Sequence, residues 1–199
     1  MTAEMSSEYP ARFVDRGESQ IANWRPLVQW LLALPHQFIA WALQYIAGPV
    51  ALVSWFIIMF TGKLPAGIAN LQAMIIRYQT LANGYTLGLT EQFPPFMFDT
   101  VSADPGTYTL GVDLQPDLGE RDRVSVFFRI FLLIPAMLMM MIYGLVFMVT
   151  GTIAWFAVLF TGKYPDGLRR ITVGLQDFVV RFSAYAMLLT DRFAPLNLT

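Results

Sequence analysis

The feature that most constrains this fold is an internal repeat at an offset of one hundred residues, without a gap. The chain reads FTGKLPAGI from Phe60 and FTGKYPDGL from Phe160. Identical residues recur on both sides of these loops, in positions that include glycine, lysine, proline and threonine. Apolar composition alone would not align those residue types in one register. We therefore predict two repeat units, over 25–96 and 125–199, with an N-terminal segment 1–24 and a linker 97–124.

Each unit contains an apolar run that is long enough to cross a membrane. The run 26–60 contains no Asp, Glu, Lys or Arg, and the run 126–160 contains only Arg129. Both exceed the about 20 residues that span a bilayer core. Charged residues make up only 14% of the chain, against about 25% in soluble domains. The sequence thus predicts an all-α integral membrane protein rather than a soluble one.

The number of crossings follows from the repeated loops. A kink or break is expected at Pro35 and Pro135, because the residue before a proline avoids the helical region. Two basic loops of nearly identical sequence are expected on one membrane face, which requires an even number of crossings per unit. We predict four membrane helices, near 36–60, 67–90, 136–160 and 167–190. The alternative keeps 67–90 and 167–190 in the membrane interface and folds each apolar run as a hairpin.

A small extramembrane cap is predicted outside the units. Residues 107–115 alternate between apolar and polar side chains, which is typical of a half-buried strand. The segment YPARFVD from Tyr9 is its expected counterpart. We expect a cap built from 9–18 and 105–120.

Orientation follows from the basic residues near the helix ends. Seven arginines lie on the side of the termini, against four Lys or Arg on the side of the repeated loops. Since basic residues are enriched in cytoplasmic segments, this excess favours cytoplasmic termini of a multi-pass protein in the bacterial inner membrane. The first twenty residues contain no apolar stretch typical of a cleaved signal peptide.

The segments YPARFVDRGE, LLALPH and AWFAVLFTGKYPDGL carry a resemblance to a known family. With their partners in the other copy, they resemble a bacterial membrane family catalogued as domain of unknown function 4389, whose members contain one or two such units. The chain departs from that pattern at Leu64, where tyrosine is usual, and at Ala136, where a histidine matching His36 is usual. The resemblance implies an architecture, and it implies no catalytic residue.

The repeated loop is interpreted as a turn that contacts lipid. Its Thr-Gly-Lys sequence lacks the remainder of a phosphate-binding loop, because Leu64 and Tyr164 occupy the place of the final Ser or Thr. Lysine side chains near helix ends extend to lipid headgroups. The candidate lipid or partner contacts are Lys63, Lys163, Arg169 and Arg170.

A second candidate set is polar and lies in the amphipathic segments. Ionisable groups at membrane depth are costly and are candidates for function. Asp177 and Arg181 are spaced i, i+4, which favours an ion pair. The predicted polar core comprises Arg77, Gln79, Asn83, Gln176, Asp177 and Arg181.

Other chemistries have little support. The chain has no cysteine and one histidine, His36, so an ordinary structural zinc site cannot be built. No nucleophile motif is present, the net charge of −1 gives no sign of nucleic-acid binding, and we predict no cofactor. We expect a non-enzymatic accessory or scaffold subunit of a membrane complex, or a homo-oligomer, with membrane lipids, other subunits or itself as partners. The alternative is a small transporter, channel or lipid-handling protein, favoured by a continuous polar path joining Gln79, Asn83, Gln176 and Arg181.

Overall fold

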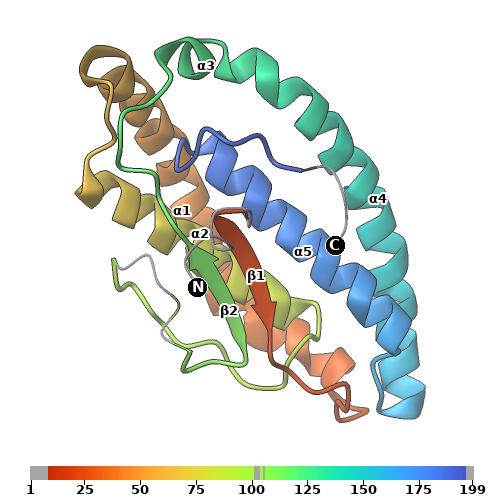
Figure 1. Cartoon of the computed structure of the whole chain (residues 1–199). Helices are drawn as coiled ribbons and strands as arrows, with labels where there is room; N and C mark the ends of the chain where they lie inside the picture. Colours follow the sequence, from red (N-terminus) through yellow and green to blue (C-terminus); the bar gives the residue numbers. More distant parts are fainter. Residues whose placement is uncertain (1–8, 101–103, 105, 196–199) are drawn as a thin grey trace, which may run out of the picture.

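The computed structural model describes residues 9–100, 104 and 106–195 as five helices and two strands (Figure 1). The predicted limits at residues 1, 105 and 199 lie outside this part of the chain. In order, the elements are β1 (Ala11–Asp15), α1 (Arg25–Thr61), α2 (Ala66–Thr86), β2 (Leu110–Leu114), α3 (Arg123–Phe127), α4 (Arg129–Thr161) and α5 (Asp166–Ala186).

The two apolar runs each form one continuous helix. α1 continues through Pro35 and Pro49, and α4 continues through Pro135. No break occurs at Pro35 or Pro135, where a kink or break was expected, and the hairpin alternative is wrong. A proline removes one backbone hydrogen bond, and the long helical segments on both sides of it outweigh that loss.

The helices α1 and α4 run antiparallel. The loop that ends the long helix of each unit therefore contacts the residues at the start of the other unit. The amide of Ile21 donates to the carbonyl of Gly162 at 3.0 Å, and the amide of Arg121 donates to that of Gly62 at 2.9 Å. The indoles repeat this exchange: Trp155 donates to the carbonyl of Pro26 at 2.8 Å, and Trp55 to that of Val126 at 2.9 Å. The loop thus occurs twice because each copy makes hydrogen bonds to the start of the other unit.

The repeated loop is also a helix-ending turn. Gly62 and Gly162 close α1 and α4 with φ values of 75° and 66°. Thr61 and Thr161 accept from the amides of Lys63 and Lys163 at 3.3 and 3.2 Å. A β-branched or bulky residue is strained at positive φ, so glycine suits both positions.

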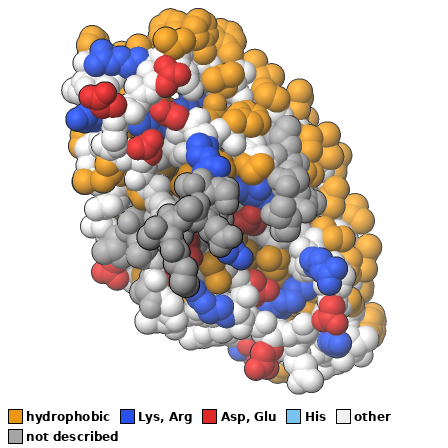
Figure 2. Space-filling model, viewed as in Figure 1, with side chains coloured by type: hydrophobic (Ala, Val, Ile, Leu, Met, Phe, Trp, Pro, Cys, Tyr) orange, Lys and Arg blue, Asp and Glu red, His pale blue; other side chains and the backbone are white. Residues whose placement is uncertain are grey.

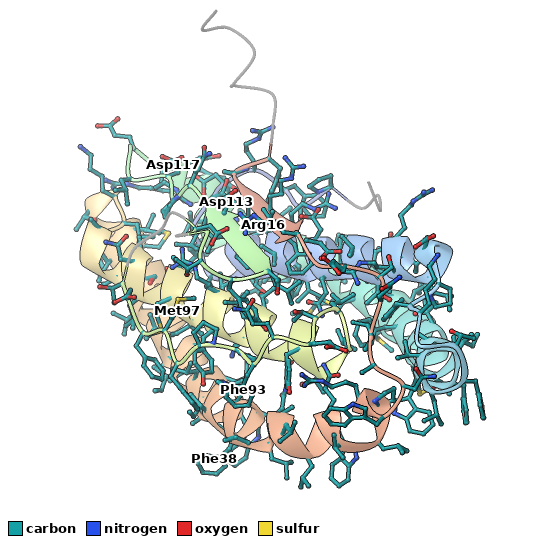
Figure 3. All side chains as sticks on the ribbon, turned by 90° about the horizontal axis from the view of Figure 1, so that it is seen from below. Arg16, Phe38, Phe93, Met97, Asp113 and Asp117 are labelled. Atoms are coloured by element: carbon teal, nitrogen blue, oxygen red, sulfur yellow. The ribbon has the colours of Figure 1, made fainter. Side chains whose placement is uncertain are left out.

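The elements form three layers. β1 and β2 pair antiparallel, with Ala11 opposite Leu114 and Asp15 opposite Leu110, which confirms both predicted strands. β1 packs on α5 and β2 on α2, while α1 packs on α2 and α4 on α5. Figure 3 shows the sheet on one side, with Arg16 and Asp113, and α1 with Phe38 on the other.

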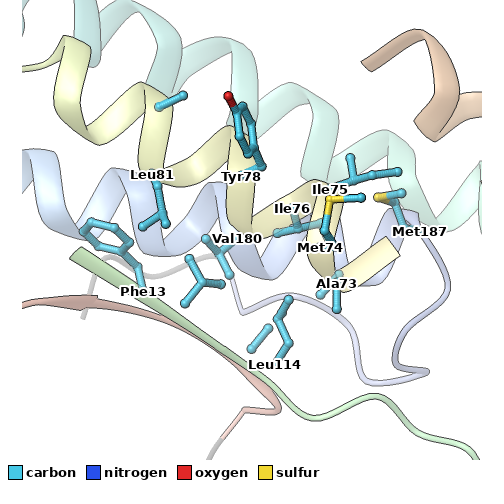
Figure 4. Packing of buried hydrophobic residues seen from close by; sticks show 14 of the residues in the cluster. Phe13, Ala73, Met74, Ile75, Ile76, Tyr78, Leu81, Leu114, Val180 and Met187 are labelled. Carbon is cyan, nitrogen blue, oxygen red and sulfur yellow. The ribbon is translucent and has the colours of Figure 1, made fainter. Parts of the chain in front are cut away.

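The main core lies between the sheet and the middle layer of α2 and α5. Phe13 and Leu114 from the strands meet apolar residues of α2 and α5, among them Met74 and Val180 (Figure 4). α2 and α5 end four residues before the predicted limits at 90 and 190.

Two helices of the described chain, α1 and α4, are long and apolar enough to cross a membrane. In the most apolar 18-residue stretch of each helix, only 22% and 11% of the residues are buried, so these helices do not lie inside the protein core. A membrane fold with four crossings is not confirmed, because the middle helices α2 and α5, although 21 residues long, are not apolar enough to qualify and are largely covered by protein.

Candidate functional site

The first candidate surface is the outer side of α1 and α4, here called the apolar face. On α1 a narrow stripe that includes Ala33, Ala40 and Ala47 is buried. The rest of α1 exposes large apolar side chains, among them Phe38, Trp41, Tyr45, Leu52, Phe56 and Phe60. On α4 the exposed set includes Ile130, Phe131, Met137, Met141, Leu145 and Phe160. Figure 2 shows such side chains along the outer edge of the molecule over α4. Continuous apolar surfaces of this kind mark membrane or protein interaction sites.

The second candidate surface, here called the arginine groove, lies on the side of the sheet. It runs between β1 and α5, has a volume of about 930 Å³ and also includes Tyr9 and Phe193. Five arginines line it, Arg12, Arg169, Arg170, Arg181 and Arg192. Three aspartates line it as well, Asp15, Asp166 and Asp177. The described lining therefore carries a net positive charge, which favours an anionic partner.

Arg169, predicted as a lipid or partner contact, is buried in the protein rather than exposed to lipid. It is 7% exposed, and its guanidinium binds both carboxylate oxygens of Asp15, at 2.9 and 2.7 Å. It also donates to the carbonyls of Glu18 and Leu89, each at 2.9 Å. A buried bidentate pair of this kind fixes the relative position of the segments that it joins. Arg169 thus joins α5, the N-terminal segment and the end of the first repeat unit.

The other three predicted contacts are exposed. Lys63, Lys163 and Arg170 all have accessible side chains. Lys163 lies 3.4 Å from Asp166. The hydroxyl of Ser19 and the ammonium of Lys163 lower the pKa of Asp166. These exposed charges stay candidates for contact with lipid headgroups or a partner.

Asp177 and Arg181 form the predicted pair, at 2.7 Å, with side chains 14% and 4% exposed. Asp177 also accepts from the amide of Phe13 at 2.7 Å, so the pair fastens β1 to α5. Burial raises the pKa of Asp177, while the Phe13 amide and the charge of Arg181 act in the opposite direction. The pair forms part of the wall of the arginine groove.

The remaining polar core residues lie apart from that pair. Gln79 donates to the carbonyl of Ala40 at 3.2 Å and to Gln44 at 3.0 Å. Arg77 is buried in α2, the helix that packs on β2. Burial lowers the pKa of Arg77 overall, although the charges of Asp104 and Asp113 act in the opposite direction.

Asn83 and Gln176 line a separate groove between the helices, whereas Arg181 lines the arginine groove. Among the described residues, the six candidates therefore do not share one pocket.

Sequence reasoning missed a buried cluster at the end of unit 2. Asp191 accepts from Arg121 at 2.8 Å and from Arg129 at 2.6 Å. Burial tends to raise the pKa of Asp191, but hydrogen bonds and charge from Arg121 and the Asp122 amide, with Arg129, lower it overall. One signal was present: Arg129 is the single charge in its apolar run, and a charge there requires a partner.

Comparison with known proteins agrees with the repeat. No curated protein and no solved structure matches the chain at a significant level. A family model with the description "Domain of unknown function (DUF4389)" matches residues 23–97 and again residues 123–195. These two matches, here called unit 1 and unit 2, cover well over half of the chain. The protein is therefore a two-unit member of the DUF4389 family.

Proposed function

We propose that this chain is a non-enzymatic membrane protein that places its apolar face in lipid and presents its sheet to water as an accessory or scaffold subunit. One observation carries the proposal: α1 and α4 expose apolar side chains along their outer sides, with the charged arginine groove on the opposite layer. Exposing such a face to water is unfavourable by about 25 cal/mol for each Å².

The antiparallel arrangement favours helices that lie along the membrane rather than across it. α2 ends beside the start of α1, where Gln29 donates to the carbonyls of Tyr85 and Thr90. The next unit begins at the other end of α1, where Arg121 binds Gly62. If α1 crossed, the linker carrying Asp113 and Asp117 would have to cross beside it. Irregular polar chain exposed to lipid is not tolerated at membrane depth.

Helix length supports the same placement. At 1.5 Å per residue, the 37 residues of α1 extend about 55 Å. To cross while keeping this whole length within a hydrocarbon core of about 30 Å, α1 would need a tilt of roughly 57°, beyond the usual range of about 0–40°. In the proposed placement, both repeated loops lie on the same side of the membrane, as expected from their sequences.

The transporter or channel alternative has less support. A continuous polar path would favour it, but Asn83 and Gln176 line one groove, Arg181 lines the arginine groove, and Gln79 lines neither. The accessory role is supported by the arginine groove, whose net positive charge suits an acidic segment of a partner subunit on the water side.

Cysteine labelling tests the placement. Because the chain has no native cysteine, Lys63→Cys, Lys163→Cys and Leu145→Cys each introduce a single thiol. With an impermeant maleimide on sealed vesicles of both orientations, the two lysine positions should react from the same side. Leu145, on the apolar face, should react only after detergent is added. Labelling of the lysine positions from opposite sides would show that α1 and α4 cross, and ready labelling at 145 would show that the apolar face is not in lipid.

Native purification tests the accessory role. Wild-type protein extracted in mild detergent should retain a partner subunit, and Arg170→Glu, on the exposed wall of the arginine groove, should reduce that retention. Arg123→Glu, exposed and outside the groove, is the matched control. Equal retention by all three proteins would argue against the groove as the partner surface.

A further inference from the structure

A second groove lies along the seam between α1 and α4, here called the seam groove. Its larger part has a volume of about 360 Å³ and its smaller part about 130 Å³. Both parts are lined by Thr86 and Leu87, so they adjoin at the end of α2. Trp30 and Trp155 line the smaller part and are 56% and 38% exposed, so the groove opens beside the apolar face.

The shape of the seam groove suits one extended chain. One side of α4 lines it from Met140 to Val158, through Tyr143, Gly144, Phe147 and Gly151. This spacing follows one helical face over about 27 Å. An added Cβ at Gly144 or Gly151 would meet no atom within 4 Å. The two glycines therefore border open space rather than a tight contact between helices.

The chemistry of the larger part indicates a neutral hydrogen-bond donor. Gln176 lines it and is 3% exposed, and its Oε1 has no hydrogen-bond partner among the described residues. A buried acceptor without a donor costs free energy that a ligand hydroxyl can recover. None of the described lining residues of this part is charged.

Two further features disfavour an anion in the seam groove. The C-terminal end of α2 contributes Asn83, Thr86 and Leu87, and carbonyl groups at that end of a helix repel negative charge. Donors of Gln37 and Thr86 on the polar rim are also engaged, because Gln37 Nε2 donates to Oδ1 of Asn83 at 3.3 Å and to Oγ1 of Thr86 at 2.8 Å, and the hydroxyl of Thr86 donates to the carbonyl of Ala82 at 2.9 Å. A carboxylate or phosphate would then face the acceptor of Gln176 with no proton to share.

We propose that the seam groove binds a neutral lipid with one apolar chain and a hydroxyl headgroup, such as a monoacylglycerol, whose hydroxyl donates to Gln176 Oε1. The chain of the lipid would lie along α4 toward Trp155. The proposal rests on the proposed placement of α1 and α4 in lipid, since the lipid would enter the groove from the membrane side. It assigns a lipid class to a site that the accessory role does not require.

Native mass spectrometry of the full chain in detergent tests the proposal with 1-monooleoylglycerol, methyl oleate and oleate as probes. The expected result is saturable binding of one 1-monooleoylglycerol per chain. Methyl oleate, which has no hydroxyl, should bind roughly tenfold more weakly, the equivalent of one good hydrogen bond. Oleate should bind more weakly as well.

Three variants locate the binding. Gly144→Leu adds a side chain whose Cβ meets no protein atom within 4 Å, and it should fill the groove and abolish binding. Gly48→Leu is the matched control, because Gly48 lies exposed on α1 and also has open space around it. Gln176→Met should remove the preference for 1-monooleoylglycerol over methyl oleate. Each variant must keep the wild-type thermal unfolding temperature or exceed it, and should that of Gly144→Leu fall, Gly151→Leu replaces it.

Several outcomes would overturn the proposal. They are unchanged binding by folded Gly144→Leu, equal binding of 1-monooleoylglycerol and methyl oleate by the wild type, and a lipid-free dimer in which a second copy covers the groove. The labelling experiment above separates the two proposals. If the lysine and Leu145 positions label as expected while lipid binding fails, the groove proposal alone is wrong.

Discussion

Unit 1 and unit 2 secure the same backbone atoms with different side chains. In unit 1, Gln29 of α1 donates to the carbonyls of Tyr85 and Thr90 at 2.5 and 3.0 Å. In unit 2, Arg129 takes that place and donates to Tyr185 and Thr190 at 3.3 and 3.0 Å. The geometry of the repeat is therefore kept by hydrogen-bond position rather than by residue identity.

The difference is one of charge. Arg129 also binds Asp191 and lies 4.0 Å from the ring centre of Tyr185, whereas the equivalent acid of unit 1, Glu91, accepts from the amide of Ala22. Asp191 keeps the matching contact as well, with the amide of Asp122 at 3.1 Å. The end of unit 1 is thus held by hydrogen bonds from the neutral side chain of Gln29, and the end of unit 2 by a buried ionic cluster. A buried ionic cluster is strongly sensitive to the loss of one partner.

The largest expected effect comes from breaking the ionic cluster. Asp191→Asn would leave Arg121 and Arg129, with side chains 0% and 3% exposed, without their carboxylate. Removing one member of a buried pair costs about 3–5 kcal/mol of unfolding free energy. The measurement is chemical unfolding of the purified protein in detergent.

The matched variant in unit 1 is Glu91→Gln. It should cost far less, because it keeps an acceptor for Ala22 and leaves no buried cation behind. Arg129→Gln should also be milder than Asp191→Asn, since glutamine makes the two carbonyl contacts in unit 1 already. Equal losses in Asp191→Asn and Glu91→Gln would contradict the distinction between the units.

The second prediction concerns the glycines of the repeated turn. Gly162→Val should cost about 1–3 kcal/mol, because a β-branched residue is strained at φ 66°. Its Cβ would also lie 2.5 Å from Oδ1 of Asn23, whereas the Cβ at Gly62 would lie 3.0 Å from Arg123. Gly162→Val should therefore destabilise somewhat more than Gly62→Val, as read from thermal unfolding and yield. Wild-type stability in both variants would argue against the turn interpretation.

The third prediction is an acid dependence specific to unit 2. The folded-state pKa of Asp191 lies below its ordinary value of 3.8, so its stabilisation is complete above that value. It is lost as the pH falls through the lower, folded-state pKa. The pKa of Asp177 is raised, so its contribution has the opposite sign: the folded state binds that proton more readily, and stability falls as the pH rises through this range.

Unfolding midpoints measured from about pH 2 to 6 separate the two groups. Asp191→Asn should flatten the acid-side loss of stability, and Asp177→Asn should steepen the net profile. An acid limb that is identical in wild type and Asp191→Asn would show that the cluster does not titrate as described.

The sequence predicted the repeat, both strands, the turn formed by the repeated loop and the Asp177–Arg181 pair, because each depends on local pattern or spacing. The exchange of loops between units could not be predicted in this way, since Trp55 and Val126 meet only through the antiparallel arrangement of whole helices. Arg169 was misjudged for a related reason. Its acid partner, Asp15, lies 154 positions away, and nothing in the spacing connects the two.

The smallest expected effect tests the exchange of contacts directly. Trp55→Phe and Trp155→Phe keep an aromatic ring, and each removes one indole N–H bond to the first turn of the other unit, to Val126 and Pro26. Each loss should cost about 1 kcal/mol, the usual net value of a hydrogen bond. Since the two bonds occupy equivalent places, the two variants should cost similar amounts in chemical unfolding. The double variant should be close to additive, because the bonds join different pairs of segments. If only one variant is destabilised, the two indole hydrogen bonds do not contribute equally, and only the tryptophan of that unit stabilises the other unit. A double variant much worse than the sum would show that the two contacts open together as one interface.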